Sequence, residues 1–355
     1  MGVAQEPQLQ ATAPAPGDRS SSSTEGVHDL RDFALQSGEV MPSLRIAWKS
    51  FGRLNASASN VIVYPTSFGA KDEDIEWLVH EQVLDPARYF VVILNLTGNG
   101  KSSSPSQVPG PTSFPAISVY DNVYAQRLTL EAVFGIREIE MVYGWSMGGM
   151  QAYHWASAFP DVVRRIAVVC GSARCATHNY VFLEGVKAAL QADPDFRDGW
   201  FHGPARRGLA AMARVYAGWA LSQAWYREQK WIEGGYSSLE DFLQRSWVEP
   251  FSQRNPNNVC AQIRTWQEAD VGRHPAYGGN WQAALLDIQA SVLLMPSETD
   301  LYFRVRDNEI EAEHLRNVVM APIPSIWGHR AGNPRHGGAD LAFVRAAVAR
   351  HLGMG

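Results

Sequence analysis

Val142-Tyr-Gly-Trp-Ser-Met-Gly-Gly-Met-Gln151 is the stretch that decides the fold. It contains the pattern Gly-x-Ser-x-Gly, with Gly144 and Gly148 two residues before and after Ser146. In a sharp turn from a strand into a helix, a serine takes strained backbone angles and projects its hydroxyl. Glycine at both flanking positions lets the strand and the helix approach without a clash. The pattern therefore predicts such a turn centred on Ser146.

The segments on either side of the turn agree with this interpretation. Residues 138–143 are predicted to form the strand that enters it, and residues 150–159 the helix that leaves it, ended by Pro160. This order of strand, turn and helix favours Ser146 as a catalytic nucleophile. The alternative is an ordinary tight turn, because glycine and serine are common in loops.

Strands and helices alternate over most of the chain. A hairpin is predicted first, from residues 32–36 and 43–48. Three further strands and the helices between them follow, over residues 60–64, 72–84, 89–95, 119–134 and 164–170. Apolar strands that alternate with helices are typical of a mostly parallel, doubly wound sheet covered on both faces. The predicted fold class is therefore α/β.

A helical segment interrupts this alternation. Residues 177–285 read as helices and are rich in tryptophan, after which the sheet pattern returns with strands at 290–295 and 317–321 and a last helix at 340–351. We therefore predict a core in two parts, residues 27–176 and 286–355, with a helical lid inserted at 177–285. Most of the inserted tryptophans are expected to form the core of the lid, and one or two to line a pocket.

The N-terminal residues 1–26 are rich in Ala, Pro, Gln and Ser, and we predict a disordered tail there.

The composition of the chain narrows its class and its partners. The apolar share of 46% is that of a globular protein. A net charge of −5 without a polybasic run argues against nucleic-acid or anionic-membrane partners. The three cysteines have the spacing of neither a disulfide framework nor a zinc site. Without a signal peptide or a long apolar run, we expect a cytoplasmic protein and no membrane association.

A nucleophilic serine needs a histidine as general base and a carboxylate that orients the histidine. Asp300 follows the strand at 290–295, and His329 follows the strand at 317–321. Ser146, Asp300 and His329 therefore fall at strand ends, in the chain order that this kind of site requires. Such a triad acts without a metal or an organic cofactor, so we predict neither.

Other residues compete for two of these roles. Glu298 lies two positions before Asp300 and offers the same carboxylate. His314 and His336 are the rivals of His329, the first in a polar helical run and the second in a polar loop. Their positions relative to the strand ends make Asp300 and His329 the preferred pair.

Backbone N–H groups must stabilise the oxygen that becomes negative during attack on a carbonyl. One should come from Met147, the residue after the nucleophile, and the other from the loop at residues 65–69. Because Pro65 has no N–H, that loop offers Thr66 or Ser67. The alternative for the loop is an ordinary turn between strand and helix.

Several motifs together carry a resemblance to a known family. They are Ser146-Met-Gly-Gly-Met-Gln151, Tyr120-Asp-Asn-Val-Tyr-Ala-Gln-Arg127, the loop at residues 95–106, Asp300-Leu-Tyr-Phe303 and Gly328-His329. In these motifs the chain resembles the homoserine O-acetyltransferase family of α/β-hydrolase proteins over roughly residues 30–350. The resemblance implies Ser146 as nucleophile, Asp300 as acid and His329 as base, with Thr66 and Met147 as the oxyanion donors. It also implies a homodimer as one form of assembly.

Three departures point to the hydrolase branch of that family. Trp145 stands where the acetyltransferases usually have glycine, residues 254–267 lack their lid motif, and Arg330 replaces an acidic residue after the histidine. The leading hypothesis is a serine hydrolase that cleaves an ester or another activated acyl group of a small molecule. The alternatives are acyl transfer from acyl-CoA to an alcohol such as homoserine, and a non-catalytic binding protein of the same fold.

Overall fold

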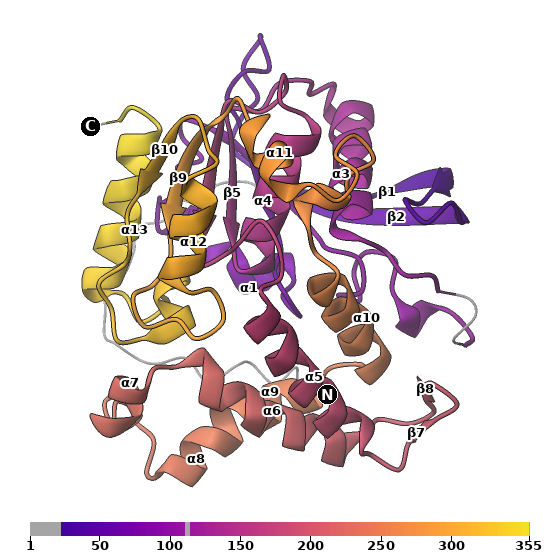
Figure 1. Ribbon diagram of the computed structural model, residues 1–355, viewed down its shortest axis with the longest axis vertical. Helices are drawn as coiled ribbons and strands as arrows, with labels where there is room; N and C mark the ends of the chain where they lie inside the picture. The colour runs from indigo at the N-terminus through magenta and orange to yellow at the C-terminus, as the bar shows by residue number, and fades with distance from the viewer. Residues whose placement is uncertain (1–22, 111–113, 355) are drawn as a thin grey trace.

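An eight-stranded sheet forms the centre of the computed structural model, which describes residues 23–110 and 114–354 (Figure 1). Its strand order is β1-β2-β4-β3-β5-β6-β9-β10. The strands are β1 (Ser23–Ala34), β2 (Val40–Phe51), β3 (Val61–Pro65), β4 (Phe90–Leu94), β5 (Met141–Trp145), β6 (Arg165–Val169), β9 (Ser291–Met295) and β10 (Val318–Met320). β1 and β2 pair antiparallel, as does β2 with β4, and the other neighbours are parallel. The predicted α/β class with a mostly parallel sheet is confirmed.

Each face of the sheet has its own apolar core. Along β3, Val61 and Val63 belong to the core that includes helices α3 (Val119–Phe134) and α4 (Met147–Ala158). The alternate residues Ile62 and Tyr64 point into the other core, with α1 (Asp72–Ile75), α2 (Trp77–His80) and α13 (Gly338–His351). Because side chains alternate across a strand, a short unbroken apolar strand serves both cores at once.

Ordered structure begins earlier than the sequence predicts. β1 starts at Ser23, so residues 23–26 of the predicted disordered tail are in the sheet, paired with residues 48–51 of β2. The indole of Trp48 lies over Gly26, where an added Cβ would meet it at 2.6 Å. Backbone pairing and one aromatic contact therefore order a segment whose polar composition gave no such signal. The rest of that tail prediction, residues 1–22, lies outside the described residues.

The single helix predicted over residues 72–84 is also wrong in extent. The chain forms only the short helices α1 and α2, and Gln82 then takes a left-handed conformation with φ of 57°. This turn carries Val83 and Leu84 back into the core, where both are buried. The apolar residues whose spacing resembled that of a longer helix therefore pack into the core around a compact turn.

The chain inserts a group of helices between β6 and β9, most of which form a separate layer. They are α5 (Thr177–Gln191), α6 (Arg206–Ala220), α7 (Gln223–Arg227), α8 (Leu239–Leu243), α9 (Glu249–Ser252), α10 (Pro256–Gln267) and α11 (Trp281–Leu286), with a small hairpin of β7 (Phe196–Arg197) and β8 (Trp200–Phe201). In Figure 1, α6 to α9 lie below the sheet, and α5 and α10 connect the two layers. Helix α12 (Val305–Ala312) follows β9. Over the described residues, no helix has the length and apolar character needed to cross a bilayer.

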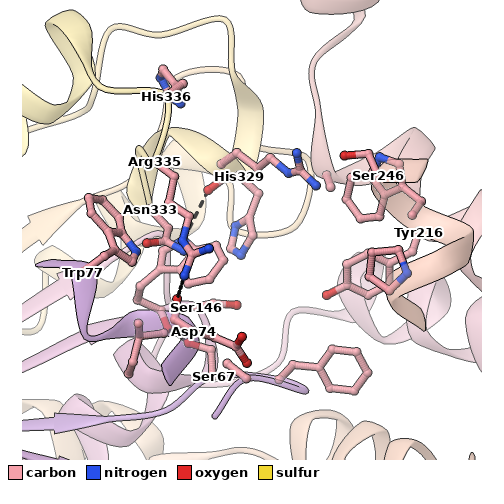
Figure 2. A pocket seen from close by; sticks show the side chains of 18 of the residues that line it. Ser67, Asp74, Trp77, Ser146, Tyr216, Ser246, His329, Asn333, Arg335 and His336 are labelled. Atoms are coloured by element: carbon pink, nitrogen blue, oxygen red, sulfur yellow. Dashed lines mark hydrogen bonds between the residues drawn. The ribbon is translucent and has the colours of Figure 1, made fainter. Parts of the chain in front are cut away.

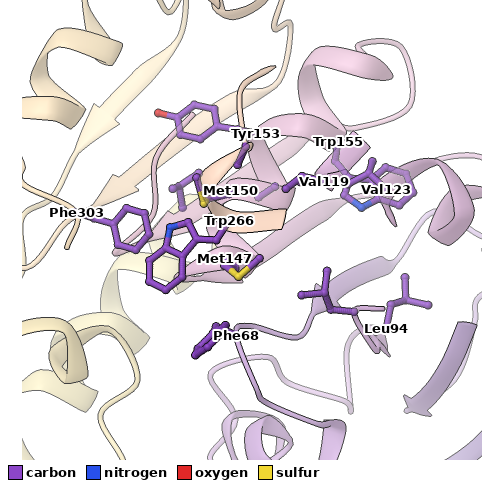
Figure 3. Close-up of a cluster of buried hydrophobic side chains, with 14 of the residues drawn as sticks. Phe68, Leu94, Val119, Val123, Met147, Met150, Tyr153, Trp155, Trp266 and Phe303 are labelled. Atoms are coloured by element: carbon purple, nitrogen blue, oxygen red, sulfur yellow. The ribbon is translucent and has the colours of Figure 1, made fainter. Parts of the chain in front are cut away.

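Aromatic packing joins the inserted helices to the sheet. Trp266 of α10 is fully buried, stacks on Phe303 with 5.6 Å between ring centroids, and lies 5.8 Å from Phe68. Figure 3 shows these side chains beside Met147, at the start of α4. The insert therefore packs directly under the turn that carries Ser146.

Candidate active site

The turn between β5 and α4 has the geometry that the sequence predicts. Ser146 has φ of 59° and ψ of −127°, which a residue with a side chain rarely adopts. A Cβ at Gly144 would lie 2.0 Å from the carbonyl oxygen of Gly148, and one at Gly148 would lie 2.8 Å from that of Pro65. Both glycines are therefore needed for the approach of strand, helix and the neighbouring loop.

Asp300 and His329 form a buried pair. The distance from Nδ1 of His329 to Oδ2 of Asp300 is 2.7 Å, and the two residues are 4% and 0% exposed, His329 first. The other carboxylate oxygen accepts hydrogen bonds from the N–H groups of Tyr302, at 2.7 Å, and Phe303, at 3.3 Å. The carboxylate is thus held rigidly, and its bond to Nδ1 leaves Nε2 of His329 for proton exchange.

Ser146 and His329 open onto one cavity of about 810 Å³. Figure 2 shows both side chains at its wall, with Tyr216 and Ser246 of the inserted helices across from them. The aromatic residues that line it are Phe68, Trp77, Trp145, Tyr216, Tyr236, Trp247, Phe251 and Trp327. Trp247 is therefore one of the inserted tryptophans that reach a pocket, as expected.

The competing residues take other positions. Glu298 is exposed, and its backbone N–H donates to the carbonyl oxygen of Ile323. His314 packs edge-on against Trp281 at 5.1 Å. His336 reaches the cavity wall, but its Nε2 lies 3.0 Å from a different carboxylate, that of Asp340. The geometry therefore favours Asp300 and His329, the preferred residues.

The two predicted oxyanion donors, Met147 and Thr66, differ in whether the N–H group is already engaged in a backbone hydrogen bond. Met147 begins α4, and the first N–H groups of a helix have no partner within it. The N–H of Thr66, however, donates to the carbonyl oxygen of Leu94 at 3.0 Å, so it extends the ladder between β3 and β4. This bond speaks against Thr66 as a donor and leaves Ser67, the alternative from the same loop. Ser67 lines the cavity, and its hydroxyl donates to the carbonyl oxygen of Trp145 at 2.5 Å.

Sequence reasoning assigned no role around His329 to the residues that surround the Asp300–His329 pair. Rings of Trp145, Tyr302 and Phe303 lie within 5.5 Å of the imidazole, measured between centroids. The signals in the sequence were the motif Asp300-Leu-Tyr-Phe303, which contains two of them, and the position of Trp145 directly before the nucleophile. The thiol of Cys170 is also near, because its sulfur, an Asp300 oxygen and a His329 nitrogen lie within 4.8 Å of one another. Burial raises the pKa of this thiol well above its usual range, so it stays neutral beside the carboxylate.

The inserted helices hold both loops that carry the pair. On the acid side, the Tyr302 hydroxyl donates to the carbonyl oxygen of Tyr216 in α6, at 3.0 Å, and Asn179 of α5 donates to that of Tyr302, at 3.1 Å. On the histidine side, the hydroxyl of Ser222 donates to the carbonyl oxygen of Ile326 at 2.5 Å. The insert is therefore part of the support of the site.

Known proteins resemble this chain over most of its length. The family model for the alpha/beta hydrolase fold matches residues 62–315. An ethyl acetate hydrolase of Pseudomonas veronii is 33% identical over 308 residues, which are 85% of this chain and 88% of that protein. A homoserine O-acetyltransferase of Trichormus variabilis is 26% identical over 331 residues, which are 88% of this chain and 91% of that protein.

Solved structures agree with the sequence comparison. The acetyl esterase MekB superposes with a TM-score of 0.89 and 30% identity, over 93% of this chain and 97% of that one. An acetylester hydrolase from Corynebacterium glutamicum superposes with a TM-score of 0.87 and 28% identity, over 93% of this chain and 96% of that one. In sequence and in structure, the chain belongs to the α/β-hydrolase fold family, in a group that contains both esterases and homoserine O-acetyltransferases.

Proposed function

We propose that the protein is a serine ester hydrolase that cleaves acetate and similarly short acyl esters of small alcohols. One observation carries the proposal: the strained Ser146 turn and the buried Asp300–His329 pair open onto the same cavity. The similarity to an ethyl acetate hydrolase and to an acetyl esterase supports the ester class and the short acyl group.

The first half of the reaction forms an acyl-enzyme. Nε2 of His329 accepts the proton of the Ser146 hydroxyl as its oxygen bonds to the ester carbonyl carbon. Asp300 keeps the imidazole in place and stabilises its positive charge. The N–H groups of Met147 and Ser67 stabilise the oxyanion. The intermediate then collapses, the bond to the alcohol oxygen breaks, and His329 gives its proton to the departing alcohol.

The second half releases the acid. His329 accepts a proton from a water molecule, whose oxygen attacks the acyl carbon of the acyl-enzyme. The bond to the Ser146 oxygen breaks, the serine recovers its proton from His329, and the carboxylic acid leaves. In this scheme residues 177–285 act as the lid of the cavity, and their aromatic side chains Tyr216, Trp247 and Phe251 favour an apolar substrate.

Acyl transfer remains the second candidate, because homoserine O-acetyltransferases are also among the relatives. The two reactions share the acyl-enzyme and differ in what attacks it, water or the hydroxyl of a bound acceptor. Cytoplasmic location and a homodimer stay predictions.

A paired assay tests the proposal. Purified protein is given ethyl acetate or p-nitrophenyl acetate in one arm, and acetyl-CoA with and without homoserine in the other. We expect ester hydrolysis that is lost in Ser146→Ala and kept in Ser57→Ala, which changes an exposed serine in the loop before β3. Homoserine-dependent release of CoA would identify a transferase instead. A Ser146→Ala variant that keeps most of its activity would refute the mechanism, and failure of a fluorophosphonate probe to label Ser146 would favour a binding protein.

A further inference from the structure

Trp145, the residue directly before the nucleophile, makes two contacts with His329. Its indole N–H donates to the backbone carbonyl oxygen of His329 at 3.2 Å. Its ring also stacks on the imidazole, with 5.0 Å between centroids and 28° between planes. One side chain therefore fixes the backbone of the histidine and covers its ring.

Trp145 is itself held in place. Its carbonyl oxygen accepts the hydrogen bond of the Ser67 hydroxyl, and Gly332 packs so closely that an added Cβ would lie 2.7 Å from the indole Cδ1. Other rings complete the surroundings of the imidazole: Tyr302 edge-on at 4.9 Å and Phe303 at 5.5 Å. The imidazole consequently has little freedom to turn away from Asp300.

We propose that Trp145 is a positioning residue that also stabilises the protonated form of His329 through the face of its indole. The inference rests on the proposed function, in which His329 becomes an imidazolium each time it accepts a proton. An aromatic face attracts a cation and leaves a neutral imidazole almost unaffected, and tryptophan does so most strongly. The contact therefore stabilises the charged imidazolium of the transition state more than the neutral imidazole of the resting enzyme. An interaction that is stronger in the transition state than in the ground state accelerates a reaction.

Other charged or titratable groups lie near this histidine or in the cavity that it lines. Asp300 and Cys170 lie beside the imidazole, and Tyr302 packs edge-on against it. Tyr216 of α6, Arg254 between α9 and α10, and Arg330 in the histidine's own turn line the same cavity. Burial raises the pKa of the Tyr302 phenol and of the Cys170 thiol, so both are neutral. A change confined to Trp145 leaves all these groups in place, so a shift in the titration of His329 reports the indole.

The test is a pH titration of His329 by NMR in protein with labelled histidine. It compares the wild type with Trp145→Leu, Trp145→Met and Trp145→Phe. We expect the midpoint to fall by about 0.5 pH unit in the Leu and Met variants, the size of one partly exposed cation–π contact. In Trp145→Phe, which keeps a ring, it should fall by less than half as much. Trp281→Leu is the control, because Trp281 also packs against a histidine, His314, away from the cavity.

A midpoint that moves no more in the Leu and Met variants than in the control would overturn the inference. Met is unbranched and more flexible than Leu, so the two adapt differently to the vacated space, and at least one folded variant without a ring is expected. Activity gives the second readout: the acidic limb of kcat/KM should move to lower pH with the NMR midpoint, and the plateau should fall about tenfold as orientation is lost. A role in stability alone would lower the melting temperature and leave that limb in place.

The two proposals fail separately. If Ser146→Ala kept its activity, the proposed function would fall, while the NMR titration would still measure the effect of Trp145 on the imidazole. If Ser146→Ala were inactive and the His329 midpoint did not respond to Trp145, only the present inference would fall.

Discussion

The hydroxyl of Tyr302 donates a hydrogen bond to the backbone carbonyl oxygen of Tyr216, at 3.0 Å. This bond joins the loop of Asp300 to helix α6 of the insert. Burial raises the pKa of the Tyr302 phenol well above its usual range, so the hydroxyl stays a donor throughout the physiological pH range. The support of the carboxylate therefore extends into the helices that cover the cavity.

Tyr302→Phe should lower both activity and stability. It keeps the ring beside His329 but removes the bond to α6, which should cost about 1 kcal/mol in the free energy of unfolding. We also expect kcat to fall several-fold, because the Asp300 loop loses an anchor. The control is Tyr226→Phe, whose hydroxyl donates to the carbonyl oxygen of Ala217 in the same helix, at 2.7 Å, instead of joining that helix to the Asp300 loop. Urea denaturation and ester hydrolysis measure both effects, and an equal kcat in the two variants would contradict this role.

Gly328→Ala should displace His329. Gly328 has φ of 57°, and an added Cβ would lie 2.9 Å from the carbonyl oxygen of Ala220 in α6. Backbone atoms cannot yield cheaply, so the turn must shift, and we expect kcat/KM to fall by more than about tenfold. Gly337→Ala is the matched control, because Gly337 also has a positive φ, of 72°, but an added Cβ there meets nothing within 4 Å. Similar losses in the two variants would mean that backbone strain, not contact with the insert, explains the effect.

Replacing the acid should separate the two carboxylates that the sequence leaves in competition. Asp300→Asn keeps the shape of the side chain but weakens control of the imidazole, and should lower kcat by on the order of 10³-fold or more. Glu298→Gln makes the same chemical change two residues away on an exposed side chain, and should leave kcat within about twofold of the wild type. Steady-state kinetics on p-nitrophenyl acetate decide the matter. The reverse order of effects would assign the role to Glu298.

Glu311 should make the stability depend on pH. Burial raises the pKa of this carboxyl from 4.5 to about 8, although the N–H of Ala173 and the side chains of Tyr153 and Asn308 donate to it. The folded protein therefore keeps a proton that the unfolded chain releases near pH 4.5, and stability should fall as pH rises from there through about 8, then level off.

Glu311→Gln should abolish most of this decline. Urea midpoints at about pH 5.5 and about pH 9 would show it as a smaller difference in the variant than in the wild type. Glu309→Gln, which changes a carboxylate in the same helix that pairs with Arg306 and is 47% exposed, should keep the wild-type difference. The expectation fails if all three proteins lose the same stability between the two pH values.

The sequence by itself determined the features that depend on neighbouring residues. The turn at Ser146 follows from two glycines within five positions, because their missing side chains are what the close approach of strand and helix requires. The parallel sheet follows from the alternation of apolar strands and helices. The order of Ser146, Asp300 and His329 follows from their places after strands, and the structure brings the last two within 2.7 Å.

The tertiary structure decided whatever depends on residues distant in the chain. The N–H of Thr66 is bonded to the carbonyl oxygen of Leu94, a residue of the adjacent strand, so only the pairing of β3 with β4 gives a reason to propose Ser67 as the oxyanion donor instead. The pairing of β1 with β2 likewise orders residues 23–26 despite their polar composition. Trp145 meets a residue 184 positions away, and Tyr302 one 86 positions away. Sequence spacing does not encode such contacts, because packing of the whole chain decides which side chains meet.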